Sequence, residues 1–173
     1  MSGLLATACT ADPGADRMPG QPQSVPGGAQ PAVVDRVVDG DTIRLHAAAD
    51  GDVLPDGEEV AVRLLEVDTP ETVRPNSPVE CYGPQASAFL TRLTPIGARV
   101  WVLDDVEPED QYGRSLLYVW TSDGRFVNRE IVSSGHGRAV LFEPNDAYID
   151  ELRDAEDDAR ADRRGLWGAC RSR

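Results

Sequence analysis

The sequence contains no lysine. All 17 basic residues are arginine, and they stand against 30 acidic residues, which gives a formal net charge of −13 at pH 7. A chain this acidic is not suited to coating nucleic acid through charge alone, so any nucleic-acid contact requires a local arginine cluster or a bridging metal ion. A GC-rich genome explains the arginine usage best, and an adaptation such as salt tolerance is the alternative.

Long apolar runs are also missing. No stretch approaches the roughly 20 consecutive apolar residues that a membrane-spanning helix needs. The 173 residues, of which 40% are hydrophobic and 27% charged, predict one ordinary globular domain with a sizeable core.

Cysteine is scarce and odd in number, with Cys9, Cys81 and Cys170. Residues 1–9 resemble the end of a secretory signal with a bacterial lipoprotein cleavage site, in which Cys9 would carry the lipid. The match is partial, because Ala6 stands where leucine is expected and the basic beginning of a signal is absent. A start codon placed too late, or a plain N-terminal tail, are the alternatives. We expect an exported protein, extracellular or at the cell surface and attached to the membrane if Cys9 is lipidated, in which Cys81 and Cys170 can pair.

Residues 10–31 combine Pro, Gly, Gln, Ala and Asp with almost no large apolar side chains. Such a segment cannot bury enough surface to offset the entropy of ordering, so it predicts a flexible linker, with an untidy terminus as the alternative. The domain itself is expected over residues 32–170, followed by a short tail at 171–173.

Residues 32–170 contain both strand patterns and helix patterns. Runs of β-branched and alternating residues indicate strands, whereas a first-turn proline followed by an apolar stripe indicates a helix. The strands are expected at 33–38, 43–45, 59–67, 99–103 and 116–120, and the helices from Pro84, over 127–132, and from Asn145 as N-cap to Gly165. Five strands with a helix after the third and more helices at the end predict an α+β domain built on a small β-barrel.

The segment 62–72 is organised unlike a core strand, because it begins apolar and then carries Arg63, Asp68 and Glu71. An unpaired charge inside an apolar strand is costly, so Arg63 needs a purpose there. Guanidinium groups match phosphate oxygens, and Arg114 offers a second one, although a surface ion pair with one of the many carboxylates is the better explanation for an arbitrary arginine in this chain. Glu71 can hold and activate an attacking water, or it can be an ordinary exposed loop residue.

Two aspartates offer oxygen ligands for a metal ion. Asp41 lies in a turn and Asp68 at a strand end, where each alone is explained by the turn preference of aspartate. On neighbouring strands, however, they could bind a hard divalent cation such as Ca²⁺, with the carbonyl of Thr69 as a third ligand. So few carboxylates predict weak binding, on the order of 10⁻⁴–10⁻³ M.

Several motifs, in this order along the chain, closely resemble those of the staphylococcal nuclease (thermonuclease) family, and the resemblance covers roughly residues 32–168. They are DGDT at 39–42, RLLEVDTPET at 63–72, YGPQASAF at 82–89, YGR at 112–114, VNRE at 127–130 and PN at 144–145. The resemblance implies an OB-type five-stranded β-barrel with three helices. It also implies Ca²⁺-dependent hydrolysis of DNA and RNA phosphodiesters, with little sequence specificity, to 3′-phosphate products.

The resemblance also implies a role for each matching residue. The arginines would neutralise charge that develops on the phosphate, the glutamate would activate water, and the tyrosine would contact a nucleotide phosphate. The implied site consists of the calcium ligands Asp41, Asp68 and the Thr69 carbonyl, the catalytic residues Arg63, Glu71 and Arg114, and the substrate-binding residue Tyr112.

Two departures from the family pattern concern the substrate. Gln111 stands where the staphylococcal enzyme has a lysine, and the segment 139–143 is one residue short, with Phe142 as its only aromatic residue. We therefore expect weaker polyanion binding and a changed base preference, with catalysis retained. A Cys81–Cys170 disulfide would hold the C-terminus beside the active-site loop, and two unrelated free thiols are the alternative.

The functional alternative to a nuclease is a non-catalytic OB-type module that binds nucleic acid or protein. All the positions carried over from the family hold the expected residue types, which favours the enzyme. We expect DNA and RNA as substrates, Ca²⁺ as cofactor and a monomeric protein.

Overall fold

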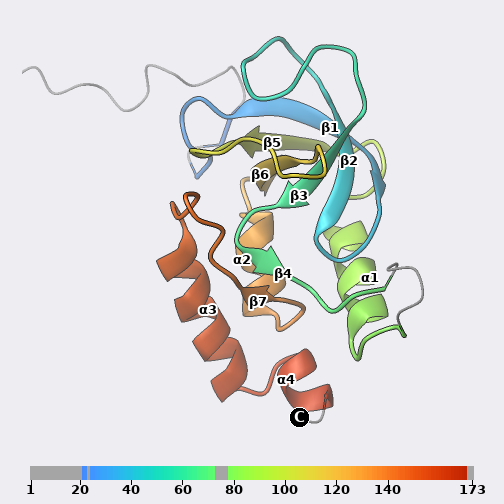
Figure 1. The fold of residues 1–173 in the computed structure, drawn as a ribbon, viewed down its shortest axis with the longest axis vertical. Helices are drawn as coiled ribbons and strands as arrows, with labels where there is room; N and C mark the ends of the chain where they lie inside the picture. The colour runs from blue at the N-terminus through green and yellow to red at the C-terminus, as the bar shows by residue number, and fades with distance from the viewer. Residues whose placement is uncertain (1–20, 23, 73–77, 171–173) are drawn as a thin grey trace, which may run out of the picture.

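The computed structural model describes residues 21–22, 24–72 and 78–170 (Figure 1). A closed barrel with the strand order β1-β2-β3-β6-β5 forms one part of the fold, and helices lie beneath it. The barrel strands are β1 (Gln30–Val37), β2 (Thr42–Ala47), β3 (Val60–Leu64), β5 (Arg99–Leu103) and β6 (Ser115–Thr121). Neighbouring strands are antiparallel except β3 and β6, which are parallel. The predicted α+β barrel is confirmed.

Alternation along the strands separates a core face from an outer face. Each large aliphatic side chain that turns inward contributes roughly 1.5–3 kcal/mol through its removal from water. The barrel core contains Val34, Ile43, Leu45, Val62, Leu64, Val100, Val102, Leu117 and Val119. The residues between them point outward, and the register places Thr42 of β2 opposite Arg63 of β3 on that outer face.

Three helices are present, as expected, and a short fourth follows; the first two contact barrel strands, and the third packs against the second. They are α1 (Gly83–Leu93), α2 (Val127–Ser133), α3 (Ile149–Ala161) and α4 (Leu166–Ala169). Figure 1 shows α2 below the barrel, with α1 and α3 on opposite sides of it. Pro84 occupies the first turn of α1, as predicted. Among the described residues, no helix is long and apolar enough to cross a membrane.

The predicted third strand, 59–67, is wrong in its continuity. β3 ends at Leu64, the chain turns at Glu66 with a φ of 58°, and β4 (Val67–Asp68) then pairs with β7 (Arg138–Ala139) instead of continuing the barrel. A left-handed φ is uncommon for any residue with a Cβ atom, so an apolar run containing no glycine gave no reason to expect the turn.

The predicted linker 10–31 is too long at its C-terminal end. Val25 and Ala29 are buried, and β1 already begins at Gln30. The Gln30 side chain accepts hydrogen bonds from the backbone N–H groups of Val53 and Leu54, at 3.0 and 2.7 Å. A polar residue thus fills a core position because it binds the loop after β2. The predicted segments 1–9 and 171–173, residues 10–20 of the linker, and Cys9 lie outside the described residues.

The last long helix is wrong at both predicted ends. It begins at Ile149, because the Asn145 side chain binds another loop: it accepts the Glu107 N–H at 2.8 Å and donates to the Glu107 carbonyl at 2.9 Å. It ends at Ala161, and Gly165, with a φ of 53°, instead precedes α4.

Cys81 and Cys170 form a disulfide with a Cα–Cα distance of 6.0 Å. The bond joins the loop before α1 to the end of α4, so the predicted pairing is confirmed and the alternative of two free thiols is not.

Candidate active site

The tight turn between β1 and β2 positions Asp41, whose side chain is buried. The Asp41 Oδ2 atom accepts hydrogen bonds from the Thr69 backbone N–H at 2.9 Å and from the Thr69 hydroxyl at 3.0 Å, while Oδ1 accepts from the Thr42 hydroxyl at 3.1 Å. The turn lies so close to Thr69 that a Cβ atom at Gly40 would stand 2.5 Å from the Thr69 Oγ1 atom. Only glycine fits at position 40, and the DGD order therefore brings Asp41 against the residues that follow β4.

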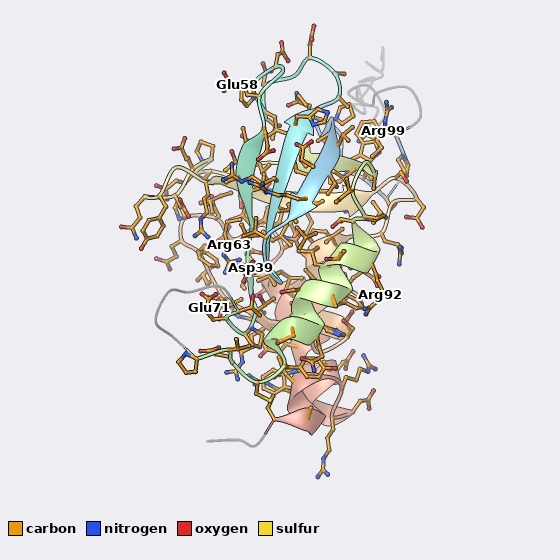
Figure 2. All side chains as sticks on the ribbon, turned by 90° about the vertical axis from the view of Figure 1, so that its right-hand side faces the viewer. Asp39, Glu58, Arg63, Glu71, Arg92 and Arg99 are labelled. Atoms are coloured by element: carbon orange, nitrogen blue, oxygen red, sulfur yellow. A yellow bond between two sulfur atoms is a disulfide. The ribbon has the colours of Figure 1, made fainter. Side chains whose placement is uncertain are left out.

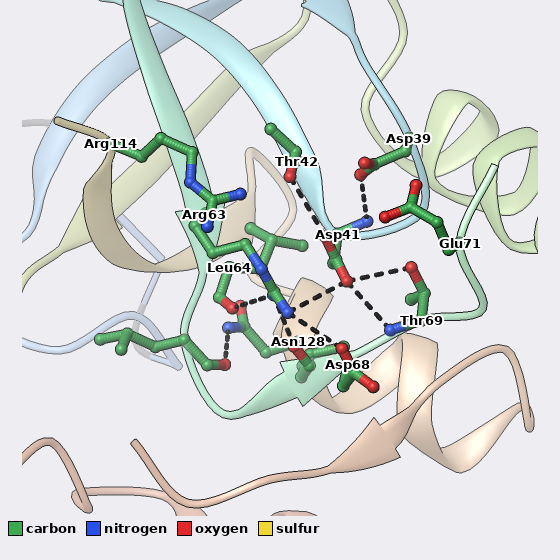
Figure 3. Close-up of polar contacts among 12 residues, drawn as sticks. Asp39, Asp41, Thr42, Arg63, Leu64, Asp68, Thr69, Glu71, Arg114 and Asn128 are labelled. Atoms are coloured by element: carbon green, nitrogen blue, oxygen red, sulfur yellow. Dashed lines mark hydrogen bonds and ion pairs between the residues drawn. The ribbon is translucent and has the colours of Figure 1, made fainter. Parts of the chain in front are cut away.

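Arg63 is held by the turn that interrupts the predicted third strand. Its Nη1 group donates to the carbonyls of Leu64 and Val67, which lie on either side of the turn. Its Nη2 atom lies 3.2 Å from Asp41 Oδ2 and 3.4 Å from Asp68 Oδ1 (Figure 3). The guanidinium is therefore buried yet fully paired, which explains how an apolar strand accommodates it. A straight strand could not have offered both carbonyls to one side chain.

Asp68 and Thr69 follow β4 and complete the inner part of the site. The Asp68 side chain is 58% exposed and shares Arg63 with Asp41. Although the side chain is more than half exposed, partial burial of its carboxyl raises the pKa of Asp68; the Arg63 charge opposes this, and the charges of Asp41 and Glu80 add to it. The predicted set Asp41, Arg63, Asp68 and Thr69 thus forms one connected network.

Asp39 belongs to the same site, although the sequence argument passed over it. Its Oδ1 atom accepts the backbone N–H of Asp41 at 3.1 Å. Burial, and then the neighbouring charge of Asp41, raise the pKa of Asp39 to about 6. Figure 2 shows Asp39 near Arg63 and Glu71. The DGD motif at 39–41 contains this aspartate, but aspartate also favours tight turns, so the motif alone did not mark Asp39 as a site residue.

Glu71 lies in the loop after β4 and is half-buried. Its carboxylate accepts the backbone N–H of Thr72 at 2.9 Å. Glu80 fixes the Glu71 backbone from both sides: the Glu71 N–H donates to Glu80 Oε2 at 3.2 Å, and the Glu80 N–H donates to the Glu71 carbonyl at 2.9 Å. Because Glu80 precedes the disulfide-bonded Cys81, the loop position of Glu71 is tied to the covalent cross-link.

Arg114 and Tyr112 lie on the turn before β6. Arg114 donates from Nε to Asp110 Oδ2 at 2.8 Å, and its Nη2 atom lies 2.7 Å from the same oxygen. Asp110 Oδ1 accepts the backbone N–H groups of Tyr112 and Arg114. Burial alone would raise the pKa of Asp110, but the hydrogen bonds from Arg114 and Tyr112 outweigh it and lower that pKa. The ion pair considered for Arg114 therefore exists, and it orients the guanidinium.

One cleft of about 750 Å³ adjoins both the loop that carries Glu71 and the turn that carries Arg114. Asp39, Glu71, Tyr112 and Arg114 all line it. Thr42 lines it too and donates its hydroxyl to Asp41, so the buried network adjoins the same cleft. Tyr112 is 76% exposed, with the Arg114 Cζ atom 5.6 Å from the centre of its ring, which leaves most of its surface to a bound molecule.

The acidic residues fit a weakly held calcium ion. Among residues 21–22, 24–72 and 78–170, no group of three or more His, Cys, Asp or Glu side chains could enclose a metal ion by itself. Calcium takes 6–8 oxygen ligands, to which water contributes freely, so two carboxylates and a carbonyl suffice for weak binding. Neighbouring carboxylates help to raise the pKa values of both Asp39 and Asp68, and a cation would relieve this repulsion.

Comparison with known proteins places the chain in a family. Residues 61–169 match the family model described as staphylococcal nuclease homologue. Over 135 residues, the chain is 42% identical to a thermonuclease from Staphylococcus intermedius, covering 78% of this chain and 74% of that protein. It is 39% identical to endonuclease YncB from Bacillus subtilis (strain 168), over 78% of this chain and 60% of that protein. A thermonuclease from Staphylococcus hyicus is 38% identical, over 78% and 73%. The chain therefore belongs to the staphylococcal nuclease family.

Proposed function

We propose that the protein is a calcium-dependent nuclease that hydrolyses DNA and RNA phosphodiesters, with little sequence specificity, to 3′-phosphate products. Family membership and relatives named thermonuclease and endonuclease support a hydrolase of this class. The observation that carries the proposal is the pairing of buried Arg63 with Asp41 and Asp68, beside a cleft that Glu71 and Arg114 also line. A module that only binds nucleic acid would not need this combination.

The two guanidinium groups would act on the phosphate. Arg63 is oriented by two carbonyls and two carboxylates before any substrate arrives, so its positive charge is already in place beside the cleft when negative charge develops on the phosphate oxygens. Arg114 reaches the cleft from the β6 side, and a phosphate would compete with Asp110 for it.

Glu71 would hold the attacking water and accept its proton as the oxygen approaches phosphorus. Formation of a 3′-phosphate requires that the bond from phosphorus to the 5′ oxygen breaks, so the 5′ oxygen leaves with the bonding electrons and takes up a proton from solvent to become a hydroxyl. Asp41, Asp68 and the Thr69 carbonyl would hold calcium, which when bound would neutralise phosphate charge and orient the reactants.

The decisive experiment measures degradation of single-stranded DNA, double-stranded DNA and RNA with Ca²⁺ and with a chelator. We expect Glu71→Gln to lower kcat by about 10²–10³-fold, within the range for a lost general base. Glu58→Gln is the matched control, because Glu58 is exposed and lies far from Glu71 (Figure 2). Product ends that a polymerase extends only after phosphatase treatment would identify 3′-phosphates.

Two results would contradict the proposal. Activity that survives the chelator would exclude calcium dependence. Tight binding of DNA or RNA without any cleavage would favour the non-catalytic OB-type module.

We also propose that the protein is exported and that Cys9 anchors it through a lipid. The Cys81–Cys170 disulfide supports an oxidising compartment. In a bacterial host with lipoprotein-processing enzymes, the wild-type chain should fractionate with membranes and Cys9→Ser should not. Equal fractionation of the two, or two titratable thiols at Cys81 and Cys170, would count against it.

A further inference from the structure

The cleft continues beyond the catalytic residues along the outer face of β2 and β3. Its lining includes Arg44, Pro55, Glu59, Val60 and Ala61. A volume of about 750 Å³ is enough for a ligand of drug size, and so for more than one phosphodiester group. The catalytic residues Glu71 and Arg114 account for only part of this lining.

The strand register places Arg44 in line with the buried arginine. Thr42 stands opposite Arg63, and Arg44 stands opposite Ala61. Because side chains alternate along a strand, Thr42 and Arg44 point to the same outer face, about 6.7 Å apart along β2 at 3.3–3.4 Å per residue. Arg44 therefore offers a guanidinium one step further along the cleft.

Glu59 is shared by two arginines. Its Oε1 atom lies 3.5 Å from Arg44 Nη1 and 3.4 Å from Arg36 Nη2. Arg36 and Arg44 are themselves partners across β1 and β2, so Glu59 relieves the repulsion between two like charges. If Arg44 turns to another anion, Glu59 keeps Arg36 as its partner. The exchange leaves no charge unpaired, which makes Arg44 easy to recruit.

We propose that Arg44 forms a second phosphate-binding subsite, which takes the phosphate next to the scissile one in a polynucleotide strand. The inference rests on the proposed nuclease function and extends it. A polynucleotide entering this cleft carries a negative charge at every nucleotide, and the Arg44 side chain, 35% exposed, is the guanidinium that lines the cleft beyond Arg114. The side chains of Pro55 and Val60 supply apolar surface for the sugar or base between the two phosphates. Glu59 competes with the substrate for Arg44 and so limits its affinity.

The test compares two substrates that differ in the number of phosphates. One is a chromogenic nucleoside aryl phosphodiester with a single phosphodiester group, and the other is a single-stranded oligonucleotide of about 12 nucleotides. We expect Arg44→Gln to raise the KM for the oligonucleotide, relative to that for the small ester, by roughly 3- to 10-fold, as for a partly exposed charged contact. Arg44→Lys should restore most of the affinity, and Glu59→Gln should lower the same KM ratio.

Arg36→Gln is the matched control, because Arg36 pairs with the same Glu59 but does not line the cleft. It should change the KM ratio by less than about twofold. The salt dependence gives an independent readout: Arg44→Gln should reduce the slope of log affinity against log salt by about 0.7, the value for one phosphate contact with a single strand.

Binding of the same oligonucleotide to the Glu71→Gln protein, measured by fluorescence anisotropy with Ca²⁺, separates the subsite from catalysis. Loss of affinity on adding Arg44→Gln supports the subsite even if the wild-type protein cleaves neither substrate, in which case the nuclease function alone fails. An unchanged affinity, or equal effects of Arg44→Gln and Arg36→Gln, would overturn the subsite while leaving the nuclease function intact.

Discussion

The two arginines of the candidate site are held in opposite ways. Arg63 is only 7% exposed, and its partners come from the β1–β2 turn and from both sides of the β3–β4 turn. Arg114 has a side chain that is 32% exposed, and its ion pair is with a single loop residue, Asp110. The inner arginine is thus part of the packing of the barrel, whereas the outer arginine is attached to its rim.

A guanidinium group therefore contributes differently to the stability of the fold at these two positions. Removal of Arg63 would leave buried Asp41 without its cation, and uncompensated buried charges are strongly destabilising. Removal of Arg114 would leave a carboxylate that water and backbone N–H groups can still serve. Activity and stability should therefore be coupled at the inner position and separable at the outer one.

The largest effect is expected for Arg63→Gln. We predict a loss of activity of about 10³–10⁵-fold, the range for an arginine that stabilises a phosphoryl transition state. We also predict that the free energy of unfolding falls by about 3–5 kcal/mol, as for a broken buried ion pair. Nuclease assays and urea unfolding measure the two effects, with Arg99→Gln, at the exposed first residue of β5, as control (Figure 2). If the unfolding curves of Arg63→Gln and Arg99→Gln coincide, Arg63 contributes no more to stability than an exposed arginine. The contrast between the inner Arg63 and the outer Arg114 then fails.

Arg114→Gln should separate the two quantities. We predict a loss in kcat of about 10²–10³-fold, as for one preorganised donor to a developing charge. The free energy of unfolding should change by less than about 1 kcal/mol, because the pair with Asp110 is partly exposed. If this variant is destabilised as much as Arg63→Gln, the rim is as integral to the fold as the barrel, and the comparison fails.

A smaller effect concerns Glu66, the residue at the turn that supports Arg63. Its side chain is fully buried, and among the described residues its Oε2 atom has no hydrogen-bond partner. The Tyr118 hydroxyl oxygen lies 2.9 Å from Glu66 Oε1 and 3.0 Å from Asp105 Oδ2. A hydroxyl has one proton to donate, so only one carboxylate can receive it, and a protonated Glu66 can donate the second hydrogen bond. Burial raises the pKa of Glu66 from its ordinary 4.5 to about 7.

The sign of the pH dependence follows from this shift. Folding favours the protonated carboxyl, so the native state binds more protons than the unfolded chain and stability falls as pH rises from 4.5 to about 7. Glu66→Gln keeps the shape and cannot ionise. We expect it to stabilise the protein by about 2–3 kcal/mol above pH 8, with little difference near pH 4.5. Urea unfolding in the presence of chelator across this range checks it, and a constant difference between variant and wild type would contradict it. The result would sharpen the comparison between Arg63 and Arg114. It would show a buried carboxyl with a raised pKa at the turn that holds Arg63, whereas Asp110, the carboxyl that holds Arg114, has a lowered pKa.

The barrel was predictable because its strands follow local rules: alternation and β-branched residues marked 99–103, which the structure reproduces as β5 without change. The site residues were identified by resemblance, and the structure brings Asp41, Arg63, Asp68 and Thr69 into one network. The roles proposed for them stay predictions.

Three features could not be predicted because they depend on partners distant in the sequence. The turn at Glu66 is specified by its pairing with β7 and by the Tyr118 hydroxyl, neither of which is visible in the segment itself. Asn145 is an excellent N-cap type that binds Glu107 instead. The choice of Asp110 as the partner of Arg114, among 30 acidic residues, likewise requires the folded turn.

The disulfide has a consequence for the covalent topology of the chain. Cys81 and Cys170, 89 residues apart, close a ring that contains the four helices of the described residues and the strands β5, β6 and β7. Strands β1 to β4 and the turns between them, which carry Asp41, Arg63 and Asp68, lie outside the ring on an uncrosslinked segment of the chain. A single protease cut within the ring leaves one covalent molecule, whereas a cut between 42 and 62 releases Asp41 from Arg63 with only noncovalent contacts to hold them. Asp41 and Arg63, the buried residues of the site, thus lie in the part of the chain that the disulfide does not protect from the effect of such a cut.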